Sequence, residues 1–240
     1  MPLPDMDALL PIIDQARQGF ARVIAGALAD GPLSSEHYAR FLTMQYHLTR
    51  GVQRYFFAVA AHPSLSRRKP LRSFLVNFAN EEELHYQVAA SDLAEMGLEP
   101  GPCPLDVELW HALFEKHTPT HPFSRLGAAA VLENMSSGEA KALVAAALSA
   151  PFLNKQNTKF VTIHRHETLP HGDQVLDALR AAQPDEAETK DLLWGASAAS
   201  VMYLRMARWA VNPEDGITEA DVHGADSAPT DRSIPIRGGV

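Results

Sequence analysis

Residues 159–171 form the most chemically distinctive segment of the sequence, because potential metal ligands recur there at helical spacing. If the segment is a helix, the apolar stripe that contains Phe160 continues through His164, Glu167 and His171. Burying even a neutral polar group without a partner costs roughly 2–7 kcal/mol, and one bound metal would compensate all three side chains. A solvated helix face and histidines hydrogen-bonded within the core are the alternatives.

A second group lies in a helix predicted over residues 70–96. Its apolar stripe leads into Glu82 and His85, and Glu-x-x-His is the spacing by which bundle-type di-iron proteins direct two ligands at one metal. Glu81, four residues before His85, is a second geometrical option. The acidic run 81–83 also fits a solvated helix face.

A third group is the carboxylate of Glu133, which follows the apolar and small residues 126–132. It lies seven residues after Leu126 and therefore on the same helix face, which predicts a buried carboxylate that requires a cation. The cation could be a metal. An ion pair with an arginine is the alternative, the candidates being Arg50, Arg54 and Arg205.

Together these segments supply mixed carboxylate and imidazole ligands, which suit iron or manganese better than structural zinc. Carboxylates that bridge two irons allow dioxygen to be reduced, so we predict a dinuclear non-haem site with two ferrous ions. The predicted ligands are Glu82 or its neighbour Glu81, together with His85, Glu133, His164, Glu167 and His171.

These ligands are to be positioned by an all-α fold, since the apolar periodicity is helical almost throughout. Short turns between the helices favour one bundle over residues 1–212. Residues 213–240 are polar and rich in Gly, Ser and Pro, which predicts a flexible tail. The seven helices are expected at 6–29, 34–61, 70–96, 105–116, 123–148, 154–169 and 185–211.

Composition narrows the functional classes. The 240 residues are 46% hydrophobic with a formal net charge of -8, which fits a soluble globular protein and argues against general nucleic-acid binding. No apolar run approaches the ~18 residues of a membrane span, and the N-terminus lacks a secretory pattern. The single Cys103 cannot form an internal disulfide. We therefore expect a cytoplasmic protein, for which a homodimer is a candidate assembly.

The helix order and the ligand spacing resemble the haem-oxygenase-like di-iron oxidases and oxygenases, a superfamily that includes TenA-type thiaminases and pyrroloquinoline quinone synthase. The resemblance covers about residues 6–211. Its pattern has a carboxylate and a histidine on the third helix, a glutamate on the fifth and His-x-x-x-Asp-x-x-His on the sixth. The spacing Glu82-x-x-His85 is most similar to that of the fatty-acid decarboxylase that makes terminal alkenes. The matching residues are Glu82, His85, Glu133, His164 and His171.

The sequence departs from this pattern at Thr168, which stands where the family has an aspartate. Glu167 and Asp173 are the candidate replacements, and binding of the second iron depends on them. Pro170 removes a backbone donor, so the helix is expected to bend or restart there, which could turn His171 away from the other ligands.

The resemblance implies oxidation of a small carboxylate-bearing substrate, such as an amino acid or a fatty acid, by dioxygen through a peroxo intermediate. A carboxylate substrate needs a basic partner. Arg50 and Lys159 are candidates, with Tyr46 as a wall of the pocket, and surface charge or plain core is the alternative for each.

Other classes of function stay open. A cofactor-less oxidase of the pyrroloquinoline quinone synthase type would use the same histidines without a metal, and a non-catalytic helical binding protein with a degenerate metal site is also compatible. A TenA-type hydrolase requires a cysteine nucleophile on a helix, which Cys103 between two prolines does not provide. Haem binding through His47 would need a second supporting feature.

Overall fold

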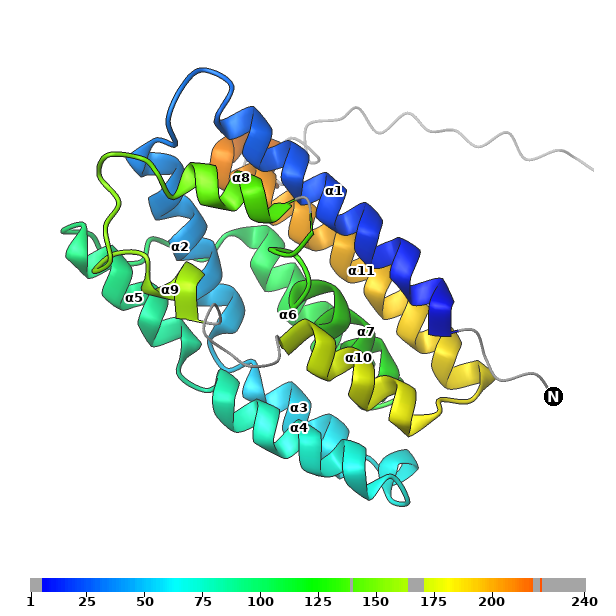
Figure 1. The fold of residues 1–240 in the computed structure, drawn as a ribbon. Helices are drawn as coiled ribbons and strands as arrows, with labels where there is room; N and C mark the ends of the chain where they lie inside the picture. Colours follow the sequence, from blue (N-terminus) through cyan, green and yellow to red (C-terminus); the bar gives the residue numbers. More distant parts are fainter. Residues whose placement is uncertain (1–5, 139, 164–170, 218–220, 222–240) are drawn as a thin grey trace, which may run out of the picture.

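The computed structural model describes residues 6–138, 140–163, 171–217 and 221. Within these residues every regular element is a helix, which confirms the predicted all-α fold (Figure 1). The helices are α1 Leu9–Ala27, α2 Ser35–Thr49, α3 Gln53–Ala61, α4 Lys69–Glu82, α5 His85–Glu95, α6 Leu105–His117, α7 Pro122–Leu132, α8 Ala140–Ala147, α9 Lys159–Thr162, α10 His171–Ala182 and α11 Glu186–Val211, with short 3-10 turns at Met6–Ala8, Pro63–Leu65 and Pro213–Asp215.

The predicted number of seven helices is wrong, because three of the long helices are interrupted. The helix expected at 34–61 ends at Thr49 and restarts at Gln53, around Gly51, whose φ of 77° lies in the left-handed region that favours glycine. The helix expected at 70–96 is divided between Glu82 and His85. The helix expected at 123–148 ends at Leu132, and a second helix, α8, begins at Ala140.

The helix expected at 154–169 does not begin where the apolar pattern suggests. Asn157 accepts a hydrogen bond from the backbone N–H of Asn154 at 2.8 Å, and Asn154 accepts one from the N–H of Gln156 at 2.8 Å. Such side-chain bonds offer the backbone an alternative to helix, so residues 154–157 form a turn instead. Helix α9 covers only Lys159–Thr162, and α10 begins at His171, directly after Pro170 in the sequence.

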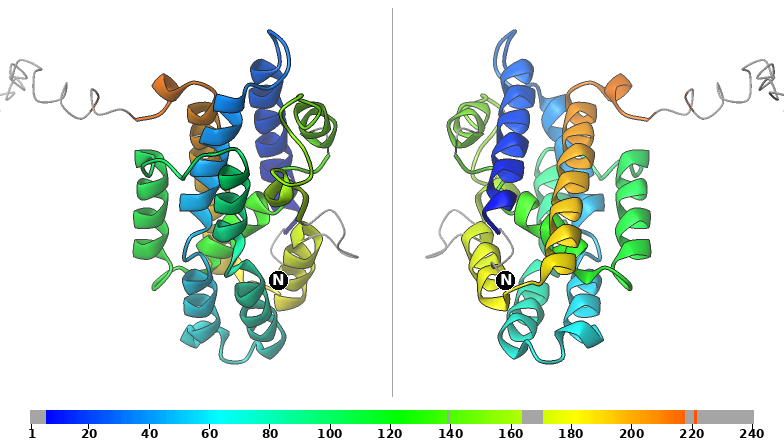
Figure 2. Two further views of the ribbon diagram at one scale, coloured as in Figure 1. Left: turned by 90° about the vertical axis from the view of Figure 1, so that its left-hand side faces the viewer. Right: turned by 90° about the vertical axis from the view of Figure 1, so that its right-hand side faces the viewer.

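Helix α7 lies at the centre of the packing and is buried from Pro122 to Val131. It contacts α11 through two glycines. A Cβ on Gly127 would lie 1.9 Å from the carbonyl oxygen of Leu192, and one on Gly195 would lie 1.9 Å from that of Ser124. The two backbones therefore touch, and α11 in turn packs beside α1 along the length of the molecule (Figure 2).

The other helices pair around this centre. Helices α3 and α4 form an antiparallel pair at one end of the molecule, α2 packs against α5, and α10 contacts both α4 and α7 (Figures 1 and 2). No helix in the described part of the chain is both long and apolar enough to cross a membrane. Most of the predicted tail, residues 213–240, lies outside the described residues.

Candidate metal centre

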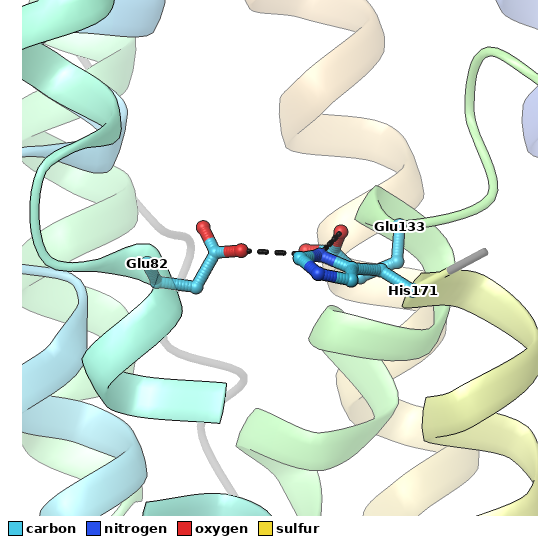
Figure 3. A group of neighbouring side chains, drawn as sticks. All are labelled: Glu82, Glu133 and His171. Atoms are coloured by element: carbon cyan, nitrogen blue, oxygen red, sulfur yellow. Dashed lines mark ion pairs between the residues drawn. The ribbon is translucent and has the colours of Figure 1, made fainter. Parts of the chain in front are cut away.

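Three of the predicted ligands, Glu82, Glu133 and His171, come together between α4, α7 and α10 (Figure 3). One potential ligand atom from each lies within 4.8 Å of the other two. Nδ1 of His171 is 3.3 Å from Oε1 of Glu82 and 3.5 Å from Oε2 of Glu133. Its Nε2 is 3.3 Å from Oε2 of Glu81, a side chain that is 55% exposed.

Each of these residues lies at the end of a helix. Glu82 is the last residue of α4, Glu133 caps the C-terminus of α7, and His171 is the first residue of α10. A start at His171 agrees with the expected restart after Pro170. The imidazole nevertheless points toward both carboxylates and not away from them (Figure 3).

The close approach of α10 to the turn after α7 depends on Gly172. A Cβ at this position would lie 2.6 Å from Oδ1 of Asn134, and the buried Asn134 side chain is itself held by a 2.8 Å hydrogen bond to the carbonyl oxygen of Ala130. Residues 171–172 and 133–134 are thereby packed directly against each other. This contact brings the His171 ring to Glu133.

Burial and charge determine the protonation of the cluster. Burial raises the pKa of Glu82, but the adjacent His171 and His85 rings outweigh it and hold this pKa at about 2. Burial lowers the pKa of His171, but the Glu133 and Glu82 carboxylates outweigh it and raise this pKa to about 10. The metal-free cluster is therefore a buried imidazolium held between carboxylates.

His85 takes a different place from the one its spacing suggested. It is the first residue of α5, not part of the same helix as Glu82, and its Nδ1 lies 2.6 Å from Oε2 of Glu82. Glu82 thus contacts His171 through one oxygen and His85 through the other. Burial lowers the pKa of His85, but the hydrogen bond with Glu82 outweighs burial. The net effect is a pKa above that of a free histidine. His85 itself is not one of the three side chains of the cluster.

The donor set fits a divalent transition metal. Two carboxylates and one imidazole are the oxygen and nitrogen ligands that iron and manganese accept. Glu82 is 6% exposed, and its Oε1 has no hydrogen-bond partner of good geometry, as is expected of an oxygen positioned for an ion. In the metal-free chain, the positive charge of the protonated His171 ring balances the carboxylates that would otherwise bind the metal ion.

The remaining predicted ligands are His164 and Glu167. Both lie outside the described residues, as does Thr168, so their roles and the second iron stay predictions. Asp173, one of the candidate replacements for the missing aspartate, is exposed on α10 and is not part of the cluster.

A cavity of about 710 Å³ opens from the cluster into the bundle. Glu82, His85, Glu133 and His171 line one part of it, and apolar side chains of α1, α2, α8 and α11 line much of the rest. Ligand pockets in proteins usually measure roughly 300–1,000 Å³, so this cavity is large enough for a substrate.

The predicted substrate contacts Arg50, Tyr46 and Lys159 do not line this cavity. Arg50 and Lys159 are exposed, and Nζ of Lys159 lies 3.3 Å from Oγ of Ser91. Tyr46 packs against the rings of His47 and Tyr86. Their roles as substrate contacts remain predictions.

Arg125 is a charged residue of the cavity that sequence reasoning missed. It lies on α7, eight residues before Glu133, and is 1% exposed. The available signal was that Arg125 is the one charged residue in the run 122–132. A long basic side chain on an apolar helix commonly extends to solvent, so its sequence position alone did not indicate burial.

Comparison with known proteins places the chain in a family. The family model described as "Iron-containing redox enzyme" matches residues 39–203. The chain belongs to this family, and the match includes Glu82, Glu133 and His171. No curated protein matches the chain.

One solved structure shares the fold. It is a domain of unknown function with a haem oxygenase-like fold from Shewanella denitrificans, with a TM-score of 0.71 and 20% identity over 86% of this chain and 90% of that one. The haem-oxygenase-like resemblance seen in the sequence is thus confirmed.

Proposed function

We propose that this protein is a non-haem iron oxidase or oxygenase that uses dioxygen to oxidise a small carboxylate-bearing substrate, such as an amino acid or a fatty acid. The observation that carries the proposal is the cluster of Glu82, Glu133 and His171 at one end of a large cavity, in a chain that belongs to the iron-containing redox enzymes. Two ferrous ions are proposed, the second held with the help of His164 and Glu167.

The residues of the site have different roles in this proposal. Glu82, Glu133 and His171 would hold the first ion, and Glu81 would orient the His171 ring by accepting from its Nε2–H. His85 donates to Glu82 and fixes the direction of that carboxylate, unless it is itself a ligand of the second ion. Bound iron would supply the electrons for dioxygen reduction. The apolar walls of the cavity exclude water from the oxidised carbon.

The test is an anaerobic ferrous titration of metal-free protein followed by elemental analysis. We expect elemental analysis to find about two bound irons per chain in the natural sequence. Glu133→Gln and His171→Ala should each lose at least one iron without loss of helical content. His121→Ala is the matched control, because His121 is half exposed and pairs with Asp191 away from the cluster.

Exposure of the loaded protein to oxygen, with carboxylate candidates present, then tests the reaction through oxygen consumption and product analysis. Iron uptake that is unchanged in both ligand variants would contradict the assignment of the site. No uptake by the natural sequence would favour a cofactor-less oxidase, in which the same His171 and carboxylates act on the substrate directly.

A further inference from the structure

The guanidinium of Arg125 is a buried charge that forms no ion pair within the described residues. Its Nε and Nη1 are buried and have no hydrogen-bond acceptor, and none of the carboxylates that the structure describes lies within ion-pair distance. Burial lowers its pKa to about 10, although Tyr55, Glu133 and Glu82 favour the charged form from beyond ion-pair distance, so the group stays protonated at neutral pH. An unpaired buried cation is costly, and a molecule that supplies an anion would remove that cost.

Aromatic rings hold this guanidinium in place but leave its donors unused. Its Cζ lies 4.5 Å from the centroid of Phe56, 5.6 Å from that of Tyr55 and 5.8 Å from that of Phe114. Cation–π contacts stabilise the charge through the faces of the aromatic rings. They do not engage the N–H groups that point outward in the plane of the guanidinium. The in-plane donors therefore remain available to a ligand.

A second unused donor lies on the wall of the same cavity. Trp110 is fully buried, its Nε1–H has no hydrogen-bond partner, and its ring packs 4.6 Å from Phe114, which also contacts Arg125. Arg125 and Trp110 both line the cavity that contains Glu82, Glu133 and His171. Buried tryptophan N–H groups usually find an acceptor, so both residues indicate a missing anionic or polar ligand.

The rest of the cavity specifies the other part of that ligand. Away from the metal centre its wall is built mainly from aliphatic and aromatic side chains, including Phe20, Ile24, Leu48, Val144, Leu148 and Val211. These residues would surround an alkyl chain. They offer little to the polar substituents of a sugar or a nucleotide.

We propose that Arg125, assisted by Trp110, binds the carboxylate of a fatty-acid-type substrate whose alkyl chain lies between α1, α2, α8 and α11. This inference rests on the proposed function in one respect, since it places carbons near the carboxylate beside Glu82, Glu133 and His171. It selects a fatty acid over an amino acid as the substrate class. Arg125 is then the residue that discriminates an acid from a neutral analogue.

The position of the alkyl chain is tested by narrowing the apolar part of the cavity. Ala147 on α8 lines the cavity, whereas its neighbour Ala146 is exposed. Ala147→Phe should shift the tightest-binding fatty acid to a shorter chain, and Ala146→Phe should leave the preference unchanged. An identical length preference in the two variants would overturn this placement of the chain.

The role of Arg125 is tested by titration calorimetry on metal-free full-length protein, with decanoate and decan-1-ol as probes. The natural sequence should bind decanoate more tightly than the alcohol by about 10- to 100-fold, the range expected for charge-assisted hydrogen bonds. Arg125→Met should remove this difference, Arg125→Lys should retain part of it, and Arg22→Met, on an exposed part of α1, should retain all of it.

The comparison is independent of iron, so its outcome separates the two proposals. Loss of iron uptake with intact decanoate selectivity would contradict the proposed function alone. Equal binding of acid and alcohol by the natural sequence, or selectivity that survives Arg125→Met, would overturn the role of Arg125. Circular dichroism of both variants shows whether they are folded, and Arg125→Lys preserves the charge if the methionine variant does not fold.

Discussion

The proton on His171 and a metal ion compete for the same place. Both ring nitrogens lie beside carboxylates, Nδ1 beside Glu82 and Glu133 and Nε2 beside Glu81. Burial lowers the pKa of the ring, but the Glu133 and Glu82 carboxylates outweigh burial and raise this pKa to about 10. At neutral pH the metal-free site is thus protonated, whereas a metal requires the neutral imidazole.

Metal binding should therefore release about one proton and weaken as the pH falls. Because His171 is protonated throughout the range below pH 10, the affinity for Mn²⁺, an air-stable probe, should fall about tenfold when the pH is lowered from 8 to 7. Calorimetry in buffers of different ionisation enthalpy measures the proton release directly. Binding with no proton released would contradict the assignment of His171 as a ligand.

The backbone contact at Gly172 determines where the His171 ring lies. Gly172→Ala would place a Cβ 2.6 Å from Oδ1 of Asn134, so either the asparagine or the start of α10 must move. We expect metal affinity to fall by at least about tenfold with little change in helical content, since a ligand displaced by even a fraction of its bond length no longer completes the site. Asn134→Ala combined with Gly172→Ala should recover most of the affinity, and failure of this double variant would show that the contact is not the cause.

At the scale of elements, the sequence indicated that Glu82 and His171 are buried, but not how the helices that carry them begin and end. Glu82, Glu133 and His171 were predicted because each interrupts an apolar stripe, and that reasoning depends only on local periodicity. The interruption of the helix between Glu82 and His85 could not be predicted, because residues 83 and 84 include no proline or glycine. The i, i+3 geometry assumed for this pair is therefore replaced by a contact between two helix ends.

The contact between α7 and α11 was also beyond the sequence. Gly127 and Gly195 are 68 positions apart in the chain, and only the structure shows that each faces the other helix's backbone. Their pattern within each helix is that of any tolerated glycine. The buried Arg125 was missed for a similar reason, since its environment is created by α3 and α6 and not by its neighbours in sequence.

Adding a methyl group at either glycine should force the two helices apart. Gly127→Ala and Gly195→Ala each create a 1.9 Å contact with a backbone oxygen, and we expect each to lower the free energy of unfolding by at least about 3 kcal/mol. Gly26→Ala is the control, because nothing lies within 4 Å of a Cβ added at this position. This alanine should stabilise α1 by about 0.5–1 kcal/mol. Urea denaturation measures all three, and equal stabilities would refute the backbone contact.

At the scale of the whole molecule, the cluster joins segments that are far apart in the chain. Residue 82 ends α4, residue 133 caps α7 and residue 171 begins α10, and of these helices α10 contacts both of the others. The metal-free chain holds these helix ends together by ion pairs to one imidazolium. A divalent metal would replace that proton by bonds to all three side chains.

A metal that binds the folded chain but not the unfolded one must stabilise the whole molecule. At a free metal concentration of about 100 times Kd the gain is about 2.7 kcal/mol, which for a chain of this size corresponds to a rise in Tm of about 5–10 °C. Glu133→Gln should abolish the rise, and His121→Ala should leave it intact. The measurement is thermal unfolding with and without Mn²⁺. The same rise in Glu133→Gln as in the natural sequence would mean that the ion binds elsewhere, because a site without Glu133 loses the ligand that connects α7 to α4 and α10.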